Sequence, residues 1–349
     1  MKRYFSIELL RFLTSLSVLL YHYRHFYSPL NFLSTNDYKN FKSELPFFNY
    51  IEVLYTYGFY GVHVFYTISG FVFAHVYLSI SKDTTFKEFS VNRIGRLYPL
   101  HFATLLFVAA LQLIYFFNYN NFQFGLINDF YHFILQIFFI SSWGFESAHS
   151  FNGPIWSVSV EMGIYILFFI LIKYLQNYNL IFTILISIIF IIIDKLQIYQ
   201  GLFLECARLF FSGVLVFFVF NKLKNKKYIF FIGSLILLIF SFIGNFKTFI
   251  FCPSLVLFTI CFEQYLKTDK INKAFSKLGN LTYALYLLHV PFQLLIIILT
   301  KNIFNNFIIF NTYFFFILYF ISLFSLAHLT FTLYEKPANA SIRKSLLNA

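Results

Sequence analysis

The chain has 349 residues, of which 59% are hydrophobic and 11% are charged, against about 25% charged residues in an ordinary soluble domain. Aromatic residues make up 24%, and runs such as LIFTILISIIFIII leave almost no polar face. These figures exclude a water-soluble globular protein and predict a polytopic membrane protein. The formal net charge of +12 does not indicate nucleic-acid binding, because the Lys and Arg residues lie mostly in short loops and accompany no nucleic-acid-binding motif.

Apolar segments follow one another along the whole chain, and most approach the length of about 20 residues that a membrane helix needs. They are residues 7–26, 55–80, 97–118, 127–143, 156–175, 179–194, 203–220, 228–245, 248–265, 281–299 and 307–333. We therefore expect an all-α fold, a bundle of transmembrane helices packed in lipid.

Basic loops predict the orientation of this bundle, because Lys and Arg are retained on the cytoplasmic side. The N-terminus, three loops and the C-terminal tail are basic, through Lys2, Arg3, Lys82, Lys87, Arg93, Arg96, Lys222, Lys224, Lys226, Lys227, Lys267, Lys270, Lys273, Lys277, Arg343 and Lys344. Two cytoplasmic loops must be joined by an even number of spans, yet five segments lie between Arg96 and Lys222. One of the five therefore does not cross.

The weakest of these segments is 127–143, which is short and interrupted by Asp129, His132 and Gln136. We expect it to be re-entrant or to lie at the interface. The prediction is then about ten transmembrane helices with both termini cytoplasmic. No Gly-, Pro- or Ser-rich linker divides the chain, so we expect one membrane domain over residues 1–349 without an appended soluble domain.

The first segment carries two ionisable residues, Arg11 and His22. Eleven residues make about three helical turns, so both side chains lie on one face, about 16 Å apart along the axis. Ionisable residues in membrane helices cost several kcal/mol and usually face a cavity or a partner. The pair is a functional candidate, although a single structural histidine is an alternative.

The second and third segments carry further candidates. His63 lies among the small residues Gly58, Gly61, Ser69 and Gly70, whose ordinary role would be close helix packing. Arg93 and Arg96 are three residues apart at the cytoplasmic entry to the next span. Two guanidinium groups on one helix face suit bidentate phosphate binding, and topological anchoring is the alternative.

Polar residues also mark later spans. Trp156, Ser157 and Glu161 lie at the outer start of one span, His289 lies within another just before Pro291, and Glu335 closes the last. An interfacial Trp is ordinary, and Glu335 could simply meet water at a helix end. A Glu one turn into an apolar helix is less ordinary.

Taken in order, these stretches resemble acyltransferase family 3, the integral-membrane acyltransferases of bacterial surface polysaccharides. The similar motifs are RFLTSLSVLLYH (Arg-x10-His), GVHVFYTISGF, RIGRLYP (Arg-x-x-Arg-x-Tyr-Pro), WSVSVEMGIY and LTYALYLLHVPF. The match runs along nearly the whole chain, from Arg11 to Pro337. Each motif is weak alone, but five in the right order are specific. One position departs from the pattern, because the family commonly has Asp where this chain has His63.

The resemblance implies transfer of an acyl group, expected to be acetyl, from acetyl-CoA or another acyl-CoA to a hydroxyl of a cell-surface glycan such as lipopolysaccharide O-antigen or exopolysaccharide. It also implies a multi-pass protein of the bacterial inner membrane that acts on a glycan or lipid-linked glycan. We expect the acyl-CoA to be a co-substrate, with no tightly bound cofactor, no metal and no nucleic-acid partner.

On this reading His22 is the general base on the acceptor hydroxyl, since the near-neutral pKa of an imidazole suits proton abstraction. Arg11 binds the donor or polarises its thioester, and Glu161 orients His22 in place of the missing Asp. The expected donor ligands are Arg93, Arg96 and Tyr98. Residues expected to have either a substrate-binding or a structural role are His63, Ser69, Trp156, Ser157, Tyr286, His289 and Glu335.

Three alternatives stay open from the sequence. A covalent acyl relay would use the same residues as direct transfer. A transporter or flippase for a lipid-linked glycan would also place charges within the membrane, although no inverted halves are evident. A membrane sensor would need no activating histidine. Turnover of acyl-CoA by the purified protein would separate the enzyme from the other two classes.

Overall fold

The structure is a computed structural model that describes residues 3–27, 42–79, 84–125, 127–222, 227–243, 246–263, 269–304 and 308–347. Within these ranges the chain is helical and contains no strand, as expected for an all-α fold. Some sequence expectations fall outside the described residues: the basic residues Lys2, Lys82, Lys224, Lys226 and Lys267, and the ends of the expected spans 55–80, 228–245, 248–265 and 307–333.

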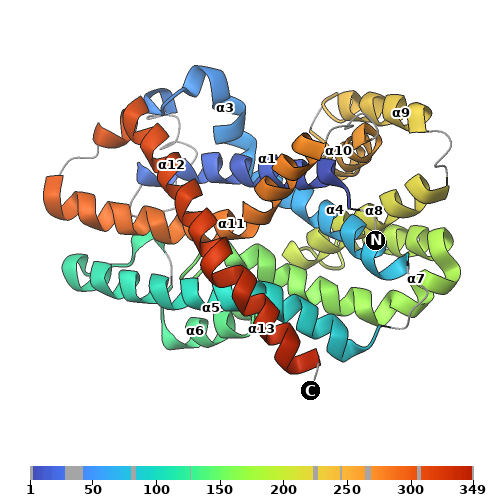
Figure 1. The fold of residues 1–349 in the computed structure, drawn as a ribbon, viewed down its shortest axis with the longest axis horizontal. Coiled ribbons are helices and arrows are strands. Elements are labelled where there is room, and N and C mark those ends of the chain that lie inside the picture. Colours follow the sequence, from blue (N-terminus) through green and yellow to red (C-terminus); the bar gives the residue numbers. More distant parts are fainter. Residues whose placement is uncertain are drawn as a thin grey trace. The chain divides into compact units, whose positions relative to one another are not determined.

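Twelve α-helices carry most of the described chain (Figure 1). They are α1 (Phe5–Tyr23), α3 (Phe48–Tyr57), α4 (Gly61–Phe73), α5 (Phe86–Tyr119), α6 (Phe130–Ile137), α7 (Ile155–Lys195), α8 (Leu202–Lys222), α9 (Lys227–Phe240), α10 (Thr248–Phe262), α11 (Asp269–Phe304), α12 (Tyr313–Thr330) and α13 (Lys336–Leu347). The last of them, α13, is amphipathic and follows the last apolar segment. Short turns of other helix types join them, among them η4 (Ala74–Leu78), η6 (Ser141–Phe145) and η10 (Phe331–Glu335).

Six helical stretches of the described chain are long and apolar enough to cross a membrane. They are Phe48–Leu78, Phe86–Tyr119, Ile155–Asn177, Leu202–Lys222, Asp269–Thr300 and Tyr313–Leu347. Two shorter apolar helices, Tyr228–Phe240 and Thr248–Phe262, coincide with other expected segments. A multi-pass membrane protein is therefore supported, while the count of about ten spans and the side of each terminus remain expectations.

The segment 127–143 forms only the short helix α6, of eight residues. At 1.5 Å per residue such a helix is about 12 Å long, less than half of a hydrocarbon core of about 30 Å. Asp129 caps its start and accepts a hydrogen bond from the backbone N–H of His132 at 2.8 Å. This geometry agrees with the expectation that the segment does not cross.

The helix α7 joins two expected segments, 156–175 and 179–194, and changes direction between them. Asn179 has a positive φ of 49° and a ψ of −124°, which no α-helical residue adopts. The two segments are thus separate straight helices on either side of this residue, as the sequence predicts.

The chain packs as two compact units, and stretches of the two alternate along the sequence. Unit 1 consists of Met1–Thr14, Tyr60–Phe86 and Val160–Asn280. Unit 2 consists of Ser15–Phe59, Lys87–Ser159 and Leu281–Ala349.

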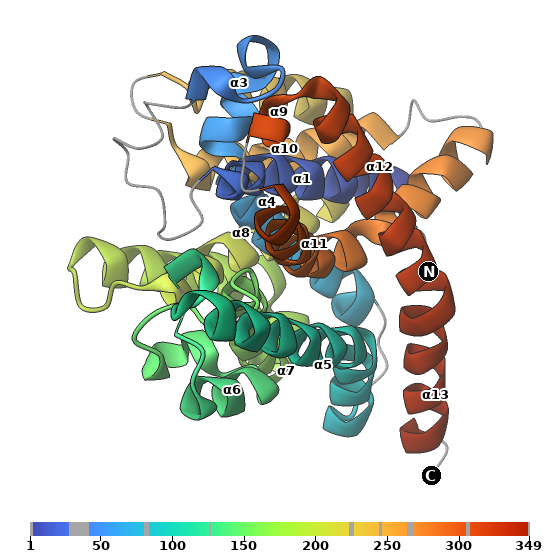
Figure 2. The ribbon, with the colours of Figure 1, turned by 90° about the vertical axis from the view of Figure 1, so that its left-hand side faces the viewer.

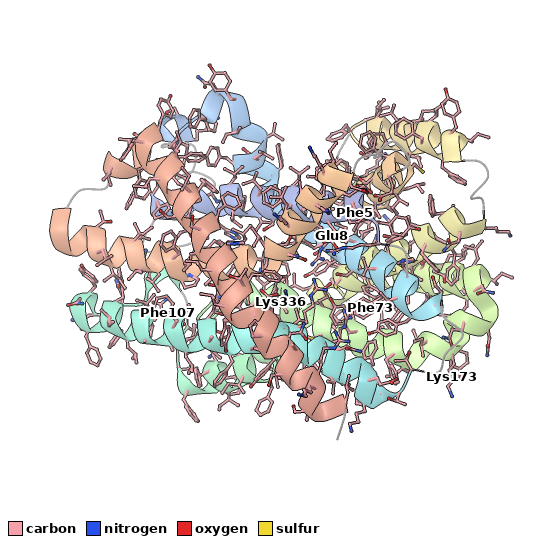
Figure 3. The ribbon with its side chains drawn as sticks, in the orientation of Figure 1. Phe5, Glu8, Phe73, Phe107, Lys173 and Lys336 are labelled. Carbon is pink, nitrogen blue, oxygen red and sulfur yellow. The ribbon has the colours of Figure 1, made fainter. Side chains whose placement is uncertain are left out.

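Unit 1 is built around the contact between α4 and α8, where two glycines let the helix backbones touch. A Cβ atom on Gly70 would overlap the carbonyl group of Phe210, and one on Gly213 would overlap that of Thr67. This confirms close packing as the role of Gly70. Beside the contact, the ring of Phe73, labelled in Figure 3, stacks on that of Tyr165 with centroids 4.1 Å apart.

The start of α1 is also held within unit 1. Glu263, just after α10, accepts hydrogen bonds from the backbone N–H groups of Phe5 at 3.1 Å and Ser6 at 2.7 Å. A carboxylate at a helix N-terminus satisfies donors that lack an intrahelical partner and interacts favourably with the helix dipole. The side chain of Glu8 lies one turn further along α1 (Figure 3), where it pairs with Arg3 at 3.1 Å.

Unit 2 has an aromatic core around the end of α1. The buried hydroxyl of Tyr23 donates to the carbonyl of Phe310 at 2.9 Å, and its ring lies near those of Phe26 and Tyr319, with centroids 5.1 and 5.7 Å away. Figure 2 shows α12, η10 and α13 following one another as one long rod at the C-terminal end of this unit.

Candidate functional site

Arg11 and His22 lie on the single unbroken helix α1, as the sequence predicts. Arg11 falls in the part of α1 that belongs to unit 1 and His22 in the part that belongs to unit 2. The guanidinium of Arg11 lies 3.6 Å from the carboxylate of Glu8, one helical turn earlier. A carboxylate at this spacing holds the arginine side chain along the helix.

Unit 2 brings His22 to His289 of α11. The Nδ1 atom of His22 and the Nε2 atom of His289 are 3.2 Å apart, within hydrogen-bond distance. One turn further along α11, the side-chain amide of Gln293 donates to the backbone carbonyl of His22 at 3.0 Å. Both His289 and Gln293 are fully buried, so α11 holds the imidazole and the backbone of His22 together.

The tautomer of the pair decides what His22 can do, since a neutral imidazole has one N–H and one lone pair. If His22 donates from Nδ1 to His289, its own Nε2 keeps a lone pair and can accept a proton. If His289 donates instead, Nε2 of His22 carries the hydrogen and is no base. His289 can therefore select the reactive form of His22.

Ser157 and Tyr286 also meet in unit 2. Their hydroxyl oxygens are 2.7 Å apart, within hydrogen-bond distance. Both also lie 3.1 Å from the carbonyl oxygen of Pro154, which can accept a hydrogen bond from either hydroxyl. The Tyr286 ring centroid is 5.9 Å from that of His289, one turn along α11. Trp156 lies beside His149, with ring centroids 6.1 Å apart.

Arg93 and Arg96 lie in the first turns of α5, partly exposed and one helical turn apart. Pro99 interrupts the backbone hydrogen bonds just beyond them. Two tyrosine hydroxyls bind carbonyls at this point: Tyr283 donates to Leu97 at 2.7 Å and Tyr334 donates to Pro99 at 3.1 Å. These contacts fix α5 next to the arginine pair.

Tyr98, the third expected donor ligand, is partly exposed on the same turn of α5, and its ring stacks with that of Phe102 at 5.9 Å. Glu335 is buried at the end of η10, rather than meeting water at a helix end.

His63 has a carboxylate partner that the sequence analysis did not single out. Its Nε2 atom lies 3.2 Å from the carboxylate of Glu205, in the first turn of α8. Ser69 is partly buried on the same helix as His63. Glu161, expected to orient His22, lies on α7 in unit 1 and is partly buried. In unit 1, therefore, His63 of α4 is paired with a carboxylate from α8.

The loop between α6 and α7 carries ionisable groups outside the membrane-spanning segments. Burial raises the pKa of Glu146 above the ordinary carboxyl value, although hydrogen bonds from Ser142 and Ser150 oppose the shift. Burial lowers the pKa of His149, whose Nδ1 lies 4.0 Å from Glu146. At the start of α6, hydrogen bonds from His132 lower the pKa of Asp129. The loop and this capping residue therefore combine groups with opposite pH responses.

Three residues of these sites were missed as partners. His289 was predicted only as a residue with a substrate-binding or structural role, and Gln293 and Glu205 were not predicted at all. Tyr286, His289 and Gln293 recur at intervals of three and four residues in an otherwise apolar helix. That polar stripe on one face of a membrane helix was the available signal.

A family model described as an acyltransferase domain matches residues 4–330 of the chain. No curated protein and no solved structure matches the chain in the corresponding comparisons. The matched range includes α1 through α12 and all five sequence motifs, whereas Glu335 and α13 lie beyond it.

Proposed function

Because the chain belongs to acyltransferase family 3, we propose that it moves an acyl group, acetyl in the simplest case, from acyl-CoA to a hydroxyl of a cell-surface glycan. The acceptor would be a glycan or lipid-linked glycan such as lipopolysaccharide O-antigen or exopolysaccharide, and the protein would reside in the bacterial inner membrane. The observation that carries this proposal is the pairing of His22 with His289, supported by Gln293.

In the proposed reaction His22 donates its Nδ1–H to His289 and uses Nε2 as the general base. The acceptor hydroxyl loses its proton to Nε2 as its oxygen attacks the thioester carbonyl. This attack forms the new C–O bond. The C–S bond then breaks, and His22 returns the proton to the leaving thiolate of CoA. General acid–base catalysis of this kind contributes about 10²- to 10⁴-fold in rate.

Acyl-CoA carries its negative charge on phosphates, which suits the pair Arg93 and Arg96. Both are partly exposed in the first turns of α5, where planar guanidinium groups can bind phosphate oxygens bidentately. Tyr98 lies on the same turn and would contact the donor. Arg11, paired with Glu8, would bind the donor or polarise its thioester.

The acceptor half of the reaction would involve the polar residues at the start of α7. Trp156 offers an aromatic surface next to His149. The hydroxyl groups of Ser157 and Tyr286 are within hydrogen-bond distance of each other, and the ring of Tyr286 lies near that of His289. Sugars and pantetheine both combine apolar and polar surfaces, so these side chains are candidates for either contact.

The test is turnover of acetyl-CoA by the purified full-length protein, with release of CoA thiol and mass-spectrometric detection of the acylated glycan. His22→Ala should insert normally, because it replaces a costly polar group in the membrane with an apolar one, and should lose acyl transfer by about 10²-fold or more. Arg11→Ala should also lose activity, but with weaker donor binding, whereas donor binding should be kept in His22→Ala.

His328→Ala is the matched control, because it removes an exposed histidine from α12. His289→Ala should reduce the rate, and His289→Gln should restore part of it, since the amide oxygen can accept the hydrogen bond from Nδ1 of His22. Normal turnover in His22→Ala would remove the acid–base assignment. Absence of acyl-CoA turnover in the wild-type protein would instead favour a transporter or flippase.

A further inference from the structure

Unit 1 contains a cavity of about 430 Å³ among α7, α8, α9 and α10. The four helices lie in the same region of Figure 1, and α10 packs against both α8 and α9. Its walls are mainly aliphatic and aromatic, with Leu215, Val219, Leu237, Phe240 and Leu257 among them. The volume falls within the range of about 300–1,000 Å³ that is typical of ligand sites.

One charged side chain lines this apolar cavity, that of Arg208 on α8, which is 13% exposed. Its guanidinium pairs with the carboxylate of Asp194 near the end of α7 and lies 3.6 Å above the ring of Phe249. The buried Nε–H has no hydrogen-bond partner among the described residues. Arg208 thus has hydrogen-bonding capacity that the protein leaves unused.

The charged and apolar parts of the cavity lie at different depths. Arg208 is six residues after the first residue of α8, Asp194 is the penultimate residue of α7, and Phe249 is the second residue of α10. Leu215 and Val219 follow Arg208 by seven and eleven residues, or about 10 and 16 Å along the helix. The cavity is therefore cationic near the end of α7 and the starts of α8 and α10, and apolar further along α8.

This arrangement matches a lipid with an anionic head and an apolar tail. We propose that the cavity binds one anionic phospholipid, with its phosphodiester group on Arg208 and one acyl chain along Leu215, Val219 and Leu257. The residues that line the cavity include neither the His22 pair nor Arg93 and Arg96, and the proposal does not depend on acyl transfer being the activity of the protein.

The charge balance favours a phosphodiester over a polyprenyl diphosphate. A single guanidinium, already shared with Asp194, can compensate one negative charge but not the two or three of a diphosphate. Asp194 is itself 31% exposed, so its carboxylate can turn toward water when the phosphate approaches. The Nε–H then gains its missing acceptor.

The experiment uses the purified full-length protein with phosphatidylglycerol that carries a photoactivatable diazirine in one acyl chain. Labelled peptides are mapped by mass spectrometry, and labelling is expected on α8 and α10 near Leu215 and Leu257. Arg208→Gln should reduce labelling about ten-fold or more, because a hydrogen bond to a charged group is lost. Lys222→Gln, which removes a cation from the other end of α8, should leave labelling unchanged.

Two further variants separate lipid binding from the structural role of the ion pair. Asp194→Asn should keep or increase labelling, since it releases the guanidinium of Arg208. The double variant Arg208→Gln with Asp194→Asn leaves no unpaired carboxylate behind, and it should still lose labelling. Leu215→Trp should fill the cavity and block labelling, and Leu235→Trp, at an exposed position of α9, should not.

Competing lipids supply the remaining outcomes. Unlabelled phosphatidylglycerol should compete, whereas diacylglycerol, which lacks the phosphate, should not. Equal competition by diacylglycerol, or unchanged labelling in the double variant, would overturn the proposal, because the cavity would then bind apolar chains without selecting the phosphate. Stronger competition by a polyprenyl diphosphate would overturn the assignment to a phospholipid.

Discussion

Arg93 and Arg96 illustrate how one residue type can serve two purposes at a membrane boundary. A guanidinium at the entry to a helix orients the chain in the bilayer whether or not it binds anything. Two of them on one helical turn, above a backbone fixed by Tyr283 and Tyr334, form a more specific arrangement. Only a change in ligand affinity can separate binding from orientation.

Arg93→Ala or Arg96→Ala is expected to weaken acyl-CoA binding by about 10- to 150-fold, the equivalent of 1.5–3 kcal/mol for a hydrogen bond to a charged group. Lysine at either position should restore part of the affinity, because it keeps the charge but lacks the planar fork. Isothermal titration with acyl-CoA measures both effects. Lys87→Ala, at an exposed position of α5, is the control, and equal affinity in all variants would leave the arginines as anchors.

Glu146, in the loop before α7, and Asp129, at the start of α6, are expected to respond to pH in opposite directions. Burial raises the pKa of Glu146, so its contribution to stability is complete below the ordinary carboxyl pKa of about 4.3 and is lost as the pH rises through the raised value. Hydrogen bonds from His132 lower the pKa of Asp129. Its contribution is therefore present above its ordinary pKa of about 3.9 and is lost as the pH falls through the lowered value.

Glu146→Gln should consequently raise the Tm near neutral pH and have less effect in acid. Asp129→Asn should lower the Tm near neutral pH, and its effect should fade in acid. Thermal unfolding of the purified wild-type and variant proteins, from acid to neutral pH, measures both differences in Tm. Parallel Tm curves for the two variants would contradict the assigned directions.

The sequence indicated individual residues of the candidate site better than their partners. Arg11 and His22 could be paired by helical spacing alone, because both lie on α1. The contact between His22 and His289 joins residues 267 positions apart, and it depends on how α11 packs against α1. Glu205 was missed for a different reason, since a carboxylate in the first turn of a membrane helix is ordinary until a histidine is found beside it.

At the scale of single helices, local signals were more informative. The interruptions in 127–143 led to the prediction that this segment does not cross, and its helix α6 has eight residues. Gly70 was correctly interpreted as a packing residue. The sequence could not supply Gly213, its counterpart on α8, because nothing local identifies which helix approaches which. The contact between α4 and α8 is a tertiary feature that only packing reveals.

Gly213→Ala tests this contact, because the added Cβ would overlap the backbone carbonyl of Thr67, which cannot move aside as a side chain could. We expect a loss of about 1–3 kcal/mol in the free energy of unfolding. Gly233→Ala in α9 is the matched control, since nothing lies within 4 Å of its added Cβ, and helix propensity should stabilise it by up to about 1 kcal/mol. The measurement is thermal unfolding, and equal Tm values for the two variants would refute close packing at Gly213.

For the whole molecule, the excess of 26 basic over 14 acidic residues bears on how the helices are oriented in the membrane. The basic loops were assigned to the cytoplasmic side of the membrane. Because two loops on the same side must be joined by an even number of spans, one of the five segments between Arg96 and Lys222 was expected not to cross. The structure has the short helix α6 at that segment.

Reporter fusions determine on which side of the membrane each loop lies. A reporter joined after Lys227 and another after Lys270 should both be found in the cytoplasm, and one near Asn152 should be found on the outer side, because an even number of spans separates the two basic loops. Enzymatic activity of paired cytoplasmic and periplasmic reporters gives the location. A periplasmic location after Lys227 would overturn the ten-span arrangement.

The contact between His63 and Glu205 also constrains the order in which these positions can change during evolution. A direct His63→Asp replacement in the present chain would set two carboxylates against each other, which raises the pKa of one and costs stability. A lineage moving between a carboxylate on α4 and one on α8 must therefore pass through a chain in which one of the positions is neutral, such as Glu205→Gln beside His63. Positions 63 and 205, distant in sequence, are expected to covary among descendants of this chain.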